Sequence, residues 1–523
     1  MTIANVRGII PAAEDFPSEV VTRAIVRDVD LGPGAGVLAL ITLDNGHDHS
    51  KPNTFGPQGL LSLNAALDAA EARAAAGEIA AVGVTGKPFI LAAGADLDGA
   101  AAAIAGAGVD PAAARERALG IASLGHAVFR RLGELPVPTF AFINGVALGG
   151  GLEVALHCTY RTISAGVPMV AFPECFLGLV PGWGGAYLLP RLIGPARALK
   201  LIIENPLSQN KMLRGPEAFE LGIADAMFQP ADFLEESLRW AARVLTGAET
   251  VSRAADALGL DGRAAGNEEE WAQAVAGARF FADGKVHGAA PAPYQALDLV
   301  AAARTASRDE GFAAEDDALA DLMLSEELRA GLYAFDLVQK RAKRPAGAPD
   351  RGLARPVTKV GVVGAGLMAA QIALLFVRRL QVPVVMTDLD QARVDSGVGY
   401  VRAEIDKQLS RGRISPDAAN RQKALIAGSV AKDGFADADF VIEAVFEELA
   451  VKRQVLAEVE AVVAETCVLA TNTSSLSVTA MASDLAHPER VVGFHFFNPV
   501  AVLPLVEVVR GSQTDDAAVA TAL

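Results

Sequence analysis

The stretch from Thr139 to Gly185 constrains the fold and the chemistry of this chain more than any other part of the sequence. It begins with an apolar, β-prone run, turns at Asn144–Gly145 and continues through three glycines, residues 149–151, into a helical run, LEVALHC. Glycines at the start of a helix let a ligand approach the backbone and leave N–H groups free to face an anion. Two carboxylates, Glu153 and Glu174, flank the glycines, and such a pair suits acid–base chemistry on a carbonyl compound.

Each glutamate alone also has an ordinary structural explanation. A carboxylate in the first turn of a helix, such as Glu153, complements the helix dipole by about 0.3–1 kcal/mol, and Glu174 is compatible with a charged loop residue. The order and close spacing of INGVALGGGLE, FPE and LVPGWGG favour the functional interpretation. These strings resemble the crotonase superfamily, specifically enoyl-CoA hydratases. The resemblance implies that Glu153 and Glu174 are the catalytic pair.

The string KPFILAAGADLDG resembles a loop of the same family that joins a strand to the next helix. By this resemblance, the N–H groups of Ala95 and Gly150 are the two donors of an oxyanion hole. A small residue at position 95 suits this role, because the thioester oxygen has to reach the backbone. An Ala/Gly-rich loop without a function is the alternative, and the pairing with Gly150 decides against it. The similarity continues at GPEAFELGIADAMF, residues 215–228.

Composition limits the other classes of function. A chain of 523 residues with 51% hydrophobic and 21% charged residues is globular and holds two to three domains. Its net charge of −16 argues against a general nucleic-acid or membrane-surface role. The three cysteines lack metal or redox spacing, and the N-terminus lacks a signal pattern. We therefore expect a cytoplasmic protein with no metal site and no integral membrane segment.

A second chemistry follows a Pro/Gly-rich linker at residues 345–356. The string PVTKVGVVGAGLMAA predicts a strand, a turn and a helix, and Gly364-x-Gly366-x-x-Ala369 fits the dinucleotide fingerprint. The next strand ends at Asp388, 24 residues after Gly364 (388 − 364), close to the spacing of about 20 expected for an acid that binds ribose. These residues predict a Rossmann domain that binds NAD.

Residues 357–511 resemble 3-hydroxyacyl-CoA dehydrogenases through VIEAVFEELAVK, ATNTSSLSVTAMA and VVGFHFFNPVAVLPLVEVV. The resemblance implies that His495 is the catalytic base and Glu507 its orienting carboxylate. Loss of a hydride requires a base on the substrate hydroxyl, and a carboxylate fixes the tautomer of the imidazole. The remaining implied contacts are Ser474 with the substrate and Glu447, Lys452 and Asn472 with the cofactor.

These observations predict an α/β protein: a crotonase-like ββα spiral domain at 20–310, a linker helix and Pro/Gly linker at 311–355, and an NAD-binding Rossmann domain at 356–513. The dehydrogenase family continues with a helical domain of about 100 residues or more that forms the other wall of the substrate site. We expect residues 514–523 to begin that domain. From a chain that ends at Leu523 we expect NAD binding with weak or absent oxidation.

The two resemblances imply fatty acid β-oxidation, in which 2-enoyl-CoA is hydrated to 3-hydroxyacyl-CoA and then oxidised by NAD to 3-oxoacyl-CoA. An oligomer is expected, with a thiolase subunit as a candidate partner and no nucleic acid. Two alternatives stay open: an enoyl-CoA isomerase, because related members work with one carboxylate, and a non-catalytic subunit that binds acyl-CoA or NAD. The presence of all four proposed acid–base residues argues against the second.

Overall fold

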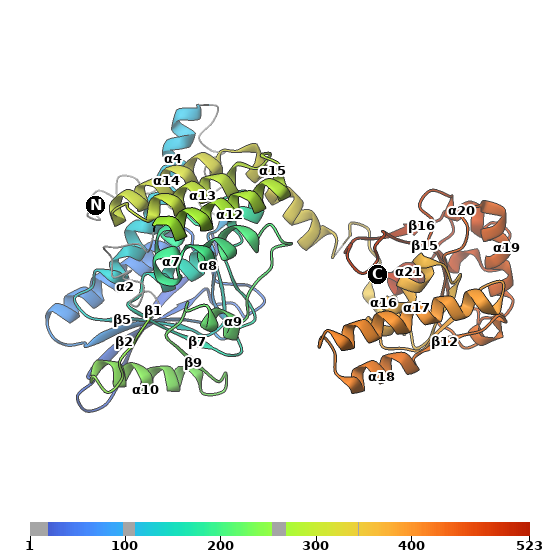
Figure 1. Cartoon of the computed structure of the whole chain (residues 1–523), viewed down its shortest axis with the longest axis horizontal. Coiled ribbons are helices and arrows are strands. Elements are labelled where there is room, and N and C mark those ends of the chain that lie inside the picture. Colours follow the sequence, from blue (N-terminus) through green and yellow to red (C-terminus); the bar gives the residue numbers. More distant parts are fainter. Residues whose placement is uncertain (1–18, 98–109, 254–267, 344) are drawn as a thin grey trace. The chain divides into compact units, whose positions relative to one another are not determined.

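The computed structural model describes residues 19–97, 110–253, 268–343 and 345–523. The chain folds into two compact units, residues 1–340 and residues 341–523 (Figure 1). Among the described residues, no helix combines the length and the apolar character that a membrane span requires.

The first unit contains two sheets, and from β3 to β9 successive strands join them alternately. The larger sheet has the order β1-β2-β3-β5-β7-β9, in which β1 and β2 are antiparallel and the other neighbours are parallel. A smaller parallel sheet has the order β4-β6-β8. The strands are β1 (Arg23–Asp30), β2 (Val37–Asp44), β3 (Ala81–Gly86), β4 (Ile90–Ala93), β5 (Thr139–Ile143), β6 (Val146–Leu148), β7 (Tyr160–Ser164), β8 (Val170–Ala171) and β9 (Ala226–Phe228). The first pair, β1 and β2, lies in the larger sheet, and each later pair (β3 and β4, β5 and β6, β7 and β8) gives one strand to each sheet before a helix follows. This arrangement confirms the predicted ββα spiral.

The central strands of the larger sheet are covered on both faces. In β5, Phe140 and Phe142 belong to a cluster with Trp240, whereas Ala141 and Ile143 belong to the main core. This alternation follows from the two-residue period of a strand. Helix α10 covers the first face, and α7, α8, α12 and α13 lie in layers on the other side (Figure 1). The helices are α2 (Pro57–Ala75), α4 (Pro111–Phe129), α5 (Gly150–Leu156), α6 (Glu174–Leu177), α7 (Gly185–Ile193), α8 (Pro195–Leu199), α9 (Gly215–Glu220), α10 (Phe233–Leu245), α12 (Glu268–Val286), α13 (Pro291–Ala303), α14 (Arg308–Met323) and α15 (Glu326–Asp336).

Helix α14 corrects the expected start of the linker at residue 311. The helix packs against α4, and its residues Phe312, Leu319 and Leu322 are buried in the core of the first unit. An apolar stripe on a helix does not reveal whether that helix connects two domains or packs on a core formed earlier in the chain. Asp316 of α14, for example, contacts His126 of α4, 190 residues before it. The structure therefore assigns residues 311–340, which include α14 and α15, to the first unit rather than to a linker.

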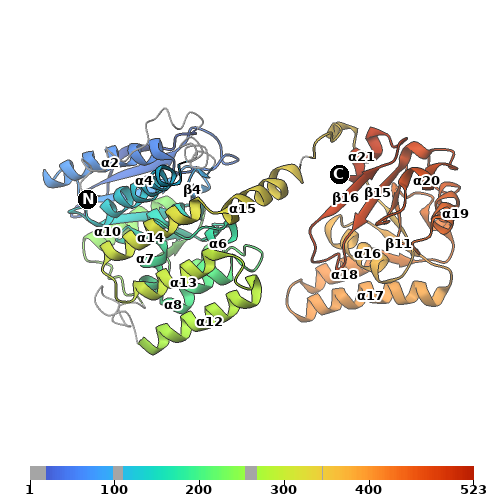
Figure 2. The ribbon, with the colours of Figure 1, turned by 90° about the horizontal axis from the view of Figure 1, so that it is seen from above.

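The second unit has a seven-stranded sheet of order β12-β11-β10-β13-β14-β15-β16. The first six strands are parallel, in the 3-2-1-4-5-6 order of dinucleotide-binding folds, and β16 joins antiparallel to β15. Separate apolar clusters lie on its two faces, one with α16 and α17 and the other with α19 and α20 (Figure 2). The elements are β10 (Val360–Val363), α16 (Leu367–Arg379), β11 (Val384–Thr387), α17 (Gln391–Ser410), α18 (Pro416–Ala424), β12 (Ile426–Gly428), β13 (Phe440–Glu443), α19 (Leu449–Glu460), β14 (Val468–Thr471), α20 (Val478–Ala482), β15 (Val491–Phe496), β16 (Val506–Arg510) and α21 (Asp516–Ala522). The predicted Rossmann fold is confirmed.

Candidate active sites

The small sheet brings together the two expected oxyanion donors. Strands β4 and β6 are parallel and in register at Ala93 and Leu148, so both chains leave the sheet side by side. Two residues further on, they reach Ala95 and Gly150. A Cβ atom added to Gly150 would lie 3.7 Å from the carbonyl carbon of Gly94. Neither the Ala95 N–H nor the Gly150 N–H has a hydrogen-bond acceptor among the described residues.

Glu174 lies against the glycine triplet. Gly149 has a φ of +50°, and a Cβ atom there would lie 2.3 Å from Oε1 of Glu174, so this position requires glycine. Oε2 of Glu174 is buried and has no hydrogen-bond partner in the described part of the chain. Burial, and then the charge of Glu153, raise the pKa of Glu174 well above its usual value. Glu174 therefore favours its neutral form.

Glu153 extends from the first turn of α5 into the interior and is 2% exposed. Its Oε1 accepts hydrogen bonds from the backbone N–H groups of Trp183 at 2.7 Å and Gly185 at 2.9 Å. Burial, and then the charge of Glu315, raise the pKa of Glu153 to about 7, against the opposing effect of the two N–H donors. The site thus holds two buried carboxyl groups whose pKa values burial raises, beside two N–H groups without an acceptor in the described part of the chain.

In the second unit, the glycine turn, Asp388 and the end of β13 meet at the point where the strand order reverses. Gly364 has a φ of +105°, and a Cβ atom there would lie 2.8 Å from the carbonyl oxygen of Ala444. Oδ2 of Asp388 accepts the N–H of Ala365 at 2.7 Å, which fixes the carboxylate beside the turn. Gly366 begins α16 without a side-chain cap, and open space lies where its Cβ atom would be. These features fit a dinucleotide, whose pyrophosphate binds at a helix N-terminus.

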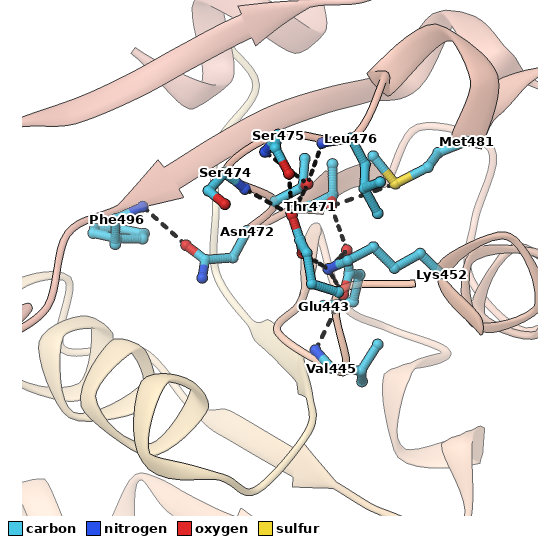
Figure 3. A network of polar contacts seen from close by, with 12 residues as sticks. Glu443, Val445, Lys452, Thr471, Asn472, Ser474, Ser475, Leu476, Met481 and Phe496 are labelled. Carbon is cyan, nitrogen blue, oxygen red and sulfur yellow. Dashed lines mark hydrogen bonds and ion pairs between the residues drawn. The ribbon is translucent and has the colours of Figure 1, made fainter. Parts of the chain in front are cut away.

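A buried ionic network joins the ends of β13 and β14 (Figure 3). Lys452 is fully buried, and its Nζ lies 2.9 Å from both carboxylate oxygens of Glu443 and 3.2 Å from Oε2 of Glu447. The hydroxyl of Thr471 also donates to Glu443. Carboxylate groups of the protein thus contact the Lys452 ammonium. Its place at the cofactor site stays a prediction.

Glu447 connects this network to the loop after β14. Its Oε1 accepts the backbone N–H of Ser474 at 3.0 Å and the hydroxyl of Thr473. Burial acts to raise its pKa, but the Thr473 hydroxyl and the Lys452 ammonium outweigh burial and lower it. Oδ1 of Asn472 accepts the N–H of Phe496 at 2.9 Å, which links β14 to β15 (Figure 3). Ser474 is exposed at the rim.

His495 and Glu507 face each other across the antiparallel pair β15 and β16. Nδ1 of His495 lies 2.8 Å from Oε2 of Glu507. A carboxylate on Nδ1 keeps the proton there and leaves Nε2 as the basic atom of the neutral ring. The twelve-residue spacing in the sequence therefore reflects direct pairing in a hairpin.

The sequence did not indicate a role for two buried carboxylates that contact these sites. Glu443 ends an apolar strand, and Glu315 lies 162 residues after Glu153 (315 − 153). Glu443 lies inside the string VIEAVFEELAVK, but the resemblance assigned it no role. Glu315 lies outside the strings that carry a resemblance, so no local signal separates it from ordinary charged residues. Among the described residues, no group of three or more His, Cys, Asp or Glu side chains is arranged to hold a metal ion.

Comparisons with known proteins match the two units to different families. Residues 34–269 match the enoyl-CoA hydratase/isomerase family, and residues 359–523 match the NAD-binding domain of 3-hydroxyacyl-CoA dehydrogenase. The fatty acid oxidation complex subunit alpha of Idiomarina loihiensis is 34% identical over 74% of this chain and 53% of that protein. The subunits alpha of Shewanella loihica and Pseudomonas putida are 32% and 35% identical, over 89% and 75% of this chain and 63% and 54% of those proteins. The chain thus spans between 53% and 63% of the length of these relatives.

Proposed function

We propose that this chain, which joins an enoyl-CoA hydratase/isomerase unit to the NAD-binding domain of a 3-hydroxyacyl-CoA dehydrogenase, is a β-oxidation enzyme. It adds water to 2-enoyl-CoA and oxidises the 3-hydroxyacyl-CoA product with NAD. The observation that carries the first step is the pair Glu153 and Glu174, two buried carboxyl groups with raised pKa values beside two N–H groups that lack an acceptor among the described residues. A pair of carboxyl groups in one buried site suits distinct base and acid roles.

In the hydration, Glu153 takes a proton from water as the oxygen attacks C3 of the enoyl thioester. The N–H groups of Ala95 and Gly150 hold the negative thioester oxygen of the enolate, and losing one such donor costs about 2.7–4 kcal/mol. Glu174 then delivers its proton to C2. Return of a proton from Glu153 to Glu174 restores the starting state, so that the net reaction consumes one water.

In the oxidation, Nε2 of His495 takes the proton of the substrate hydroxyl, while Glu507 stabilises the imidazolium that forms. Ser474, at the rim, contacts the same hydroxyl. NAD, when bound, would supply the acceptor for the hydride that leaves C3. The residues proposed to form the NAD site are Gly364, Gly366, Asp388, Glu447, Lys452 and Asn472.

We also propose an oligomeric assembly in the cytoplasm that includes a thiolase subunit. The support is the name of the relatives, which are subunits of a fatty acid oxidation complex. A thiolase would consume the 3-oxoacyl-CoA product. Co-expression with a thiolase from the same genome, followed by size-exclusion chromatography, tests this assembly, and separate elution of the two proteins would contradict it.

Hydration is tested by the loss of conjugated enoyl thioester absorbance with crotonyl-CoA, without metal or nucleotide. Glu153→Gln and Glu174→Gln are each expected to lower kcat/KM by about 10²–10⁴-fold. Glu235→Gln, at an exposed ion pair with Arg239 on α10, is the matched control and keeps the parent rate. Rates within a few-fold of the parent for both site variants would refute the assignment. An isomerase would instead convert 3-enoyl-CoA and leave crotonyl-CoA unhydrated.

A further inference from the structure

The turn at residues 181–187 is held between two buried carboxylates that come from distant parts of the chain. The N–H groups of Trp183 and Gly185 donate to Glu153. The N–H groups of Gly184 and Tyr187 donate to Oε2 and Oε1 of Glu315, both at 2.6 Å. Successive N–H groups of Trp183, Gly184 and Gly185 thus donate alternately to Glu153 and Glu315. Any displacement of the turn that loosens the bonds to Glu315 also displaces the donors that orient Glu153.

Glu315 lies on α14, and its side chain is 1% exposed. Nε2 of the buried His126, on α4, lies 3.0 Å from Glu315, and Nδ1 lies 2.6 Å from Oδ1 of Asp316. A carboxylate on each ring nitrogen favours a doubly protonated imidazolium. Burial acts to lower the pKa of His126, but the two carboxylates outweigh it and raise the pKa to about 9. The ring of Phe312 stacks on His126 at 4.3 Å and excludes water from that face.

We propose that Glu315 and His126 are positioning residues of the hydratase site, which fix the turn at 181–187 and thereby the orientation and charge of Glu153. The inference rests on the proposed hydration. It adds to that site a segment that follows the family match at residues 34–269. The first unit therefore needs α14 for chemistry as well as for packing.

The charges around Glu153 distinguish this role from packing alone. Glu315 and His126 act on the pKa of Glu153 in opposite directions, because the first charge is negative and the second positive. Two other groups face the same turn or site. His157 contacts the carbonyl oxygen of Trp183 at 2.9 Å, and burial lowers its pKa to about 3, so it is neutral; Glu174 favours its neutral form as well. Removal of the Glu315 charge alone therefore lowers the pKa of Glu153.

The experiment measures kcat and KM for crotonyl-CoA hydration by the full chain between pH 5 and 9. Because Glu153 acts as a base, the acid limb of the profile follows its pKa. Glu315→Gln is expected to move the acid limb to lower pH and to lower kcat by about 10–100-fold, as misplacement of a catalytic group does. Burial raises the pKa of Glu315, and the hydrogen bond from His126 is the largest effect that opposes it. His126→Gln therefore weakens the charge of Glu315 and is expected to lower kcat as well.

Two further variants separate geometry from charge and from folding. Glu315→Asp keeps the charge but withdraws the carboxylate from the turn, so kcat is expected to fall without movement of the limb. Asp321 lies on α14, as Glu315 does, and forms an exposed ion pair with Arg115 of α4. Asp321→Asn is therefore the matched control and is expected to keep the parent profile. If Glu315→Gln fails to fold, Glu315→Asp decides alone: a kcat equal to that of the parent overturns the proposal.

The proposal is also overturned if a folded Glu315→Gln variant leaves the acid limb in place, while the parent hydrates crotonyl-CoA. That result would leave the proposed function intact. A parent chain that is folded and does not hydrate crotonyl-CoA would overturn the proposed function, and this inference with it.

Discussion

The buried imidazolium of His126 should make the stability of the first unit depend on pH. Its pKa is 6.5 in an unfolded chain and about 9 in the folded protein. A group with a raised pKa stabilises the fold fully below the unfolded value, and this contribution is lost as the pH rises through the folded value. The interval from 6.5 to about 9, at 1.36 kcal/mol for each pH unit, corresponds to about 3 kcal/mol. Because His126 is almost completely buried, solvent screening does not reduce this value substantially.

The assay is urea unfolding followed by tryptophan fluorescence at pH values from 6.5 to 9.5. All three tryptophans of the chain, Trp183, Trp240 and Trp271, lie in the first unit, so the signal reports that unit alone. The comparison is between the parent and His126→Gln, so that other titrating groups largely cancel. The difference in the free energy of unfolding is expected to shrink by about 3 kcal/mol over this range. A difference that stays constant within about 1 kcal/mol would refute the assignment of a charged His126.

Two glycine substitutions test the two sites independently, and each serves as the control for the other. Gly149→Ala places a Cβ atom 2.3 Å from Glu174 Oε1 at a φ of +50°, and is expected to lower kcat for hydration by about 100-fold, with the NAD affinity unchanged in calorimetry. Gly364→Ala places a Cβ atom 2.8 Å from the Ala444 carbonyl oxygen at a φ of +105°, and is expected to raise the Kd for NAD about tenfold, or about 1.4 kcal/mol, with hydration unchanged. Unaltered hydration in the first variant, or unaltered NAD affinity in the second, would contradict the corresponding assignment.

The sequence alone could predict those parts of the fold and sites that short motifs determine. The three glycines at 149–151 indicated a helix start, where the positive φ of Gly149 restricts the residue type locally. The roles of Glu153 and Glu174 came from the resemblance of the surrounding strings to a known family. The dinucleotide fingerprint at Gly364 and Gly366 is local in the same way. His495 and Glu507 were paired from spacing and resemblance, and the structure brings them together as register partners in a hairpin.

Residues that act across long sequence distances escaped prediction for a physical reason. Glu315 and His126 are 189 positions apart, and their contact exists only because α14 packs against α4. The buried ion pair between Lys452 and Glu443 likewise depends on the fold, because the sequence pattern does not show that both side chains are buried. Burial and partner choice depend on tertiary packing, which local propensity and periodicity do not encode.

The bond between Glu315 and the turn at 181–187 also bears on the order in which this chain becomes competent during synthesis. Glu153, Glu174 and the turn leave the ribosome well before α14 does. The interval of 162 residues from Glu153 to Glu315 (315 − 153) takes roughly 8–32 s at about 5–20 residues per second. During that time, Gly184 and Tyr187 have no carboxylate to receive their N–H groups. On the proposed role of Glu315, the first unit becomes competent for hydration only after translation has passed residue 315, and helix α14 near the end of that unit sets the time.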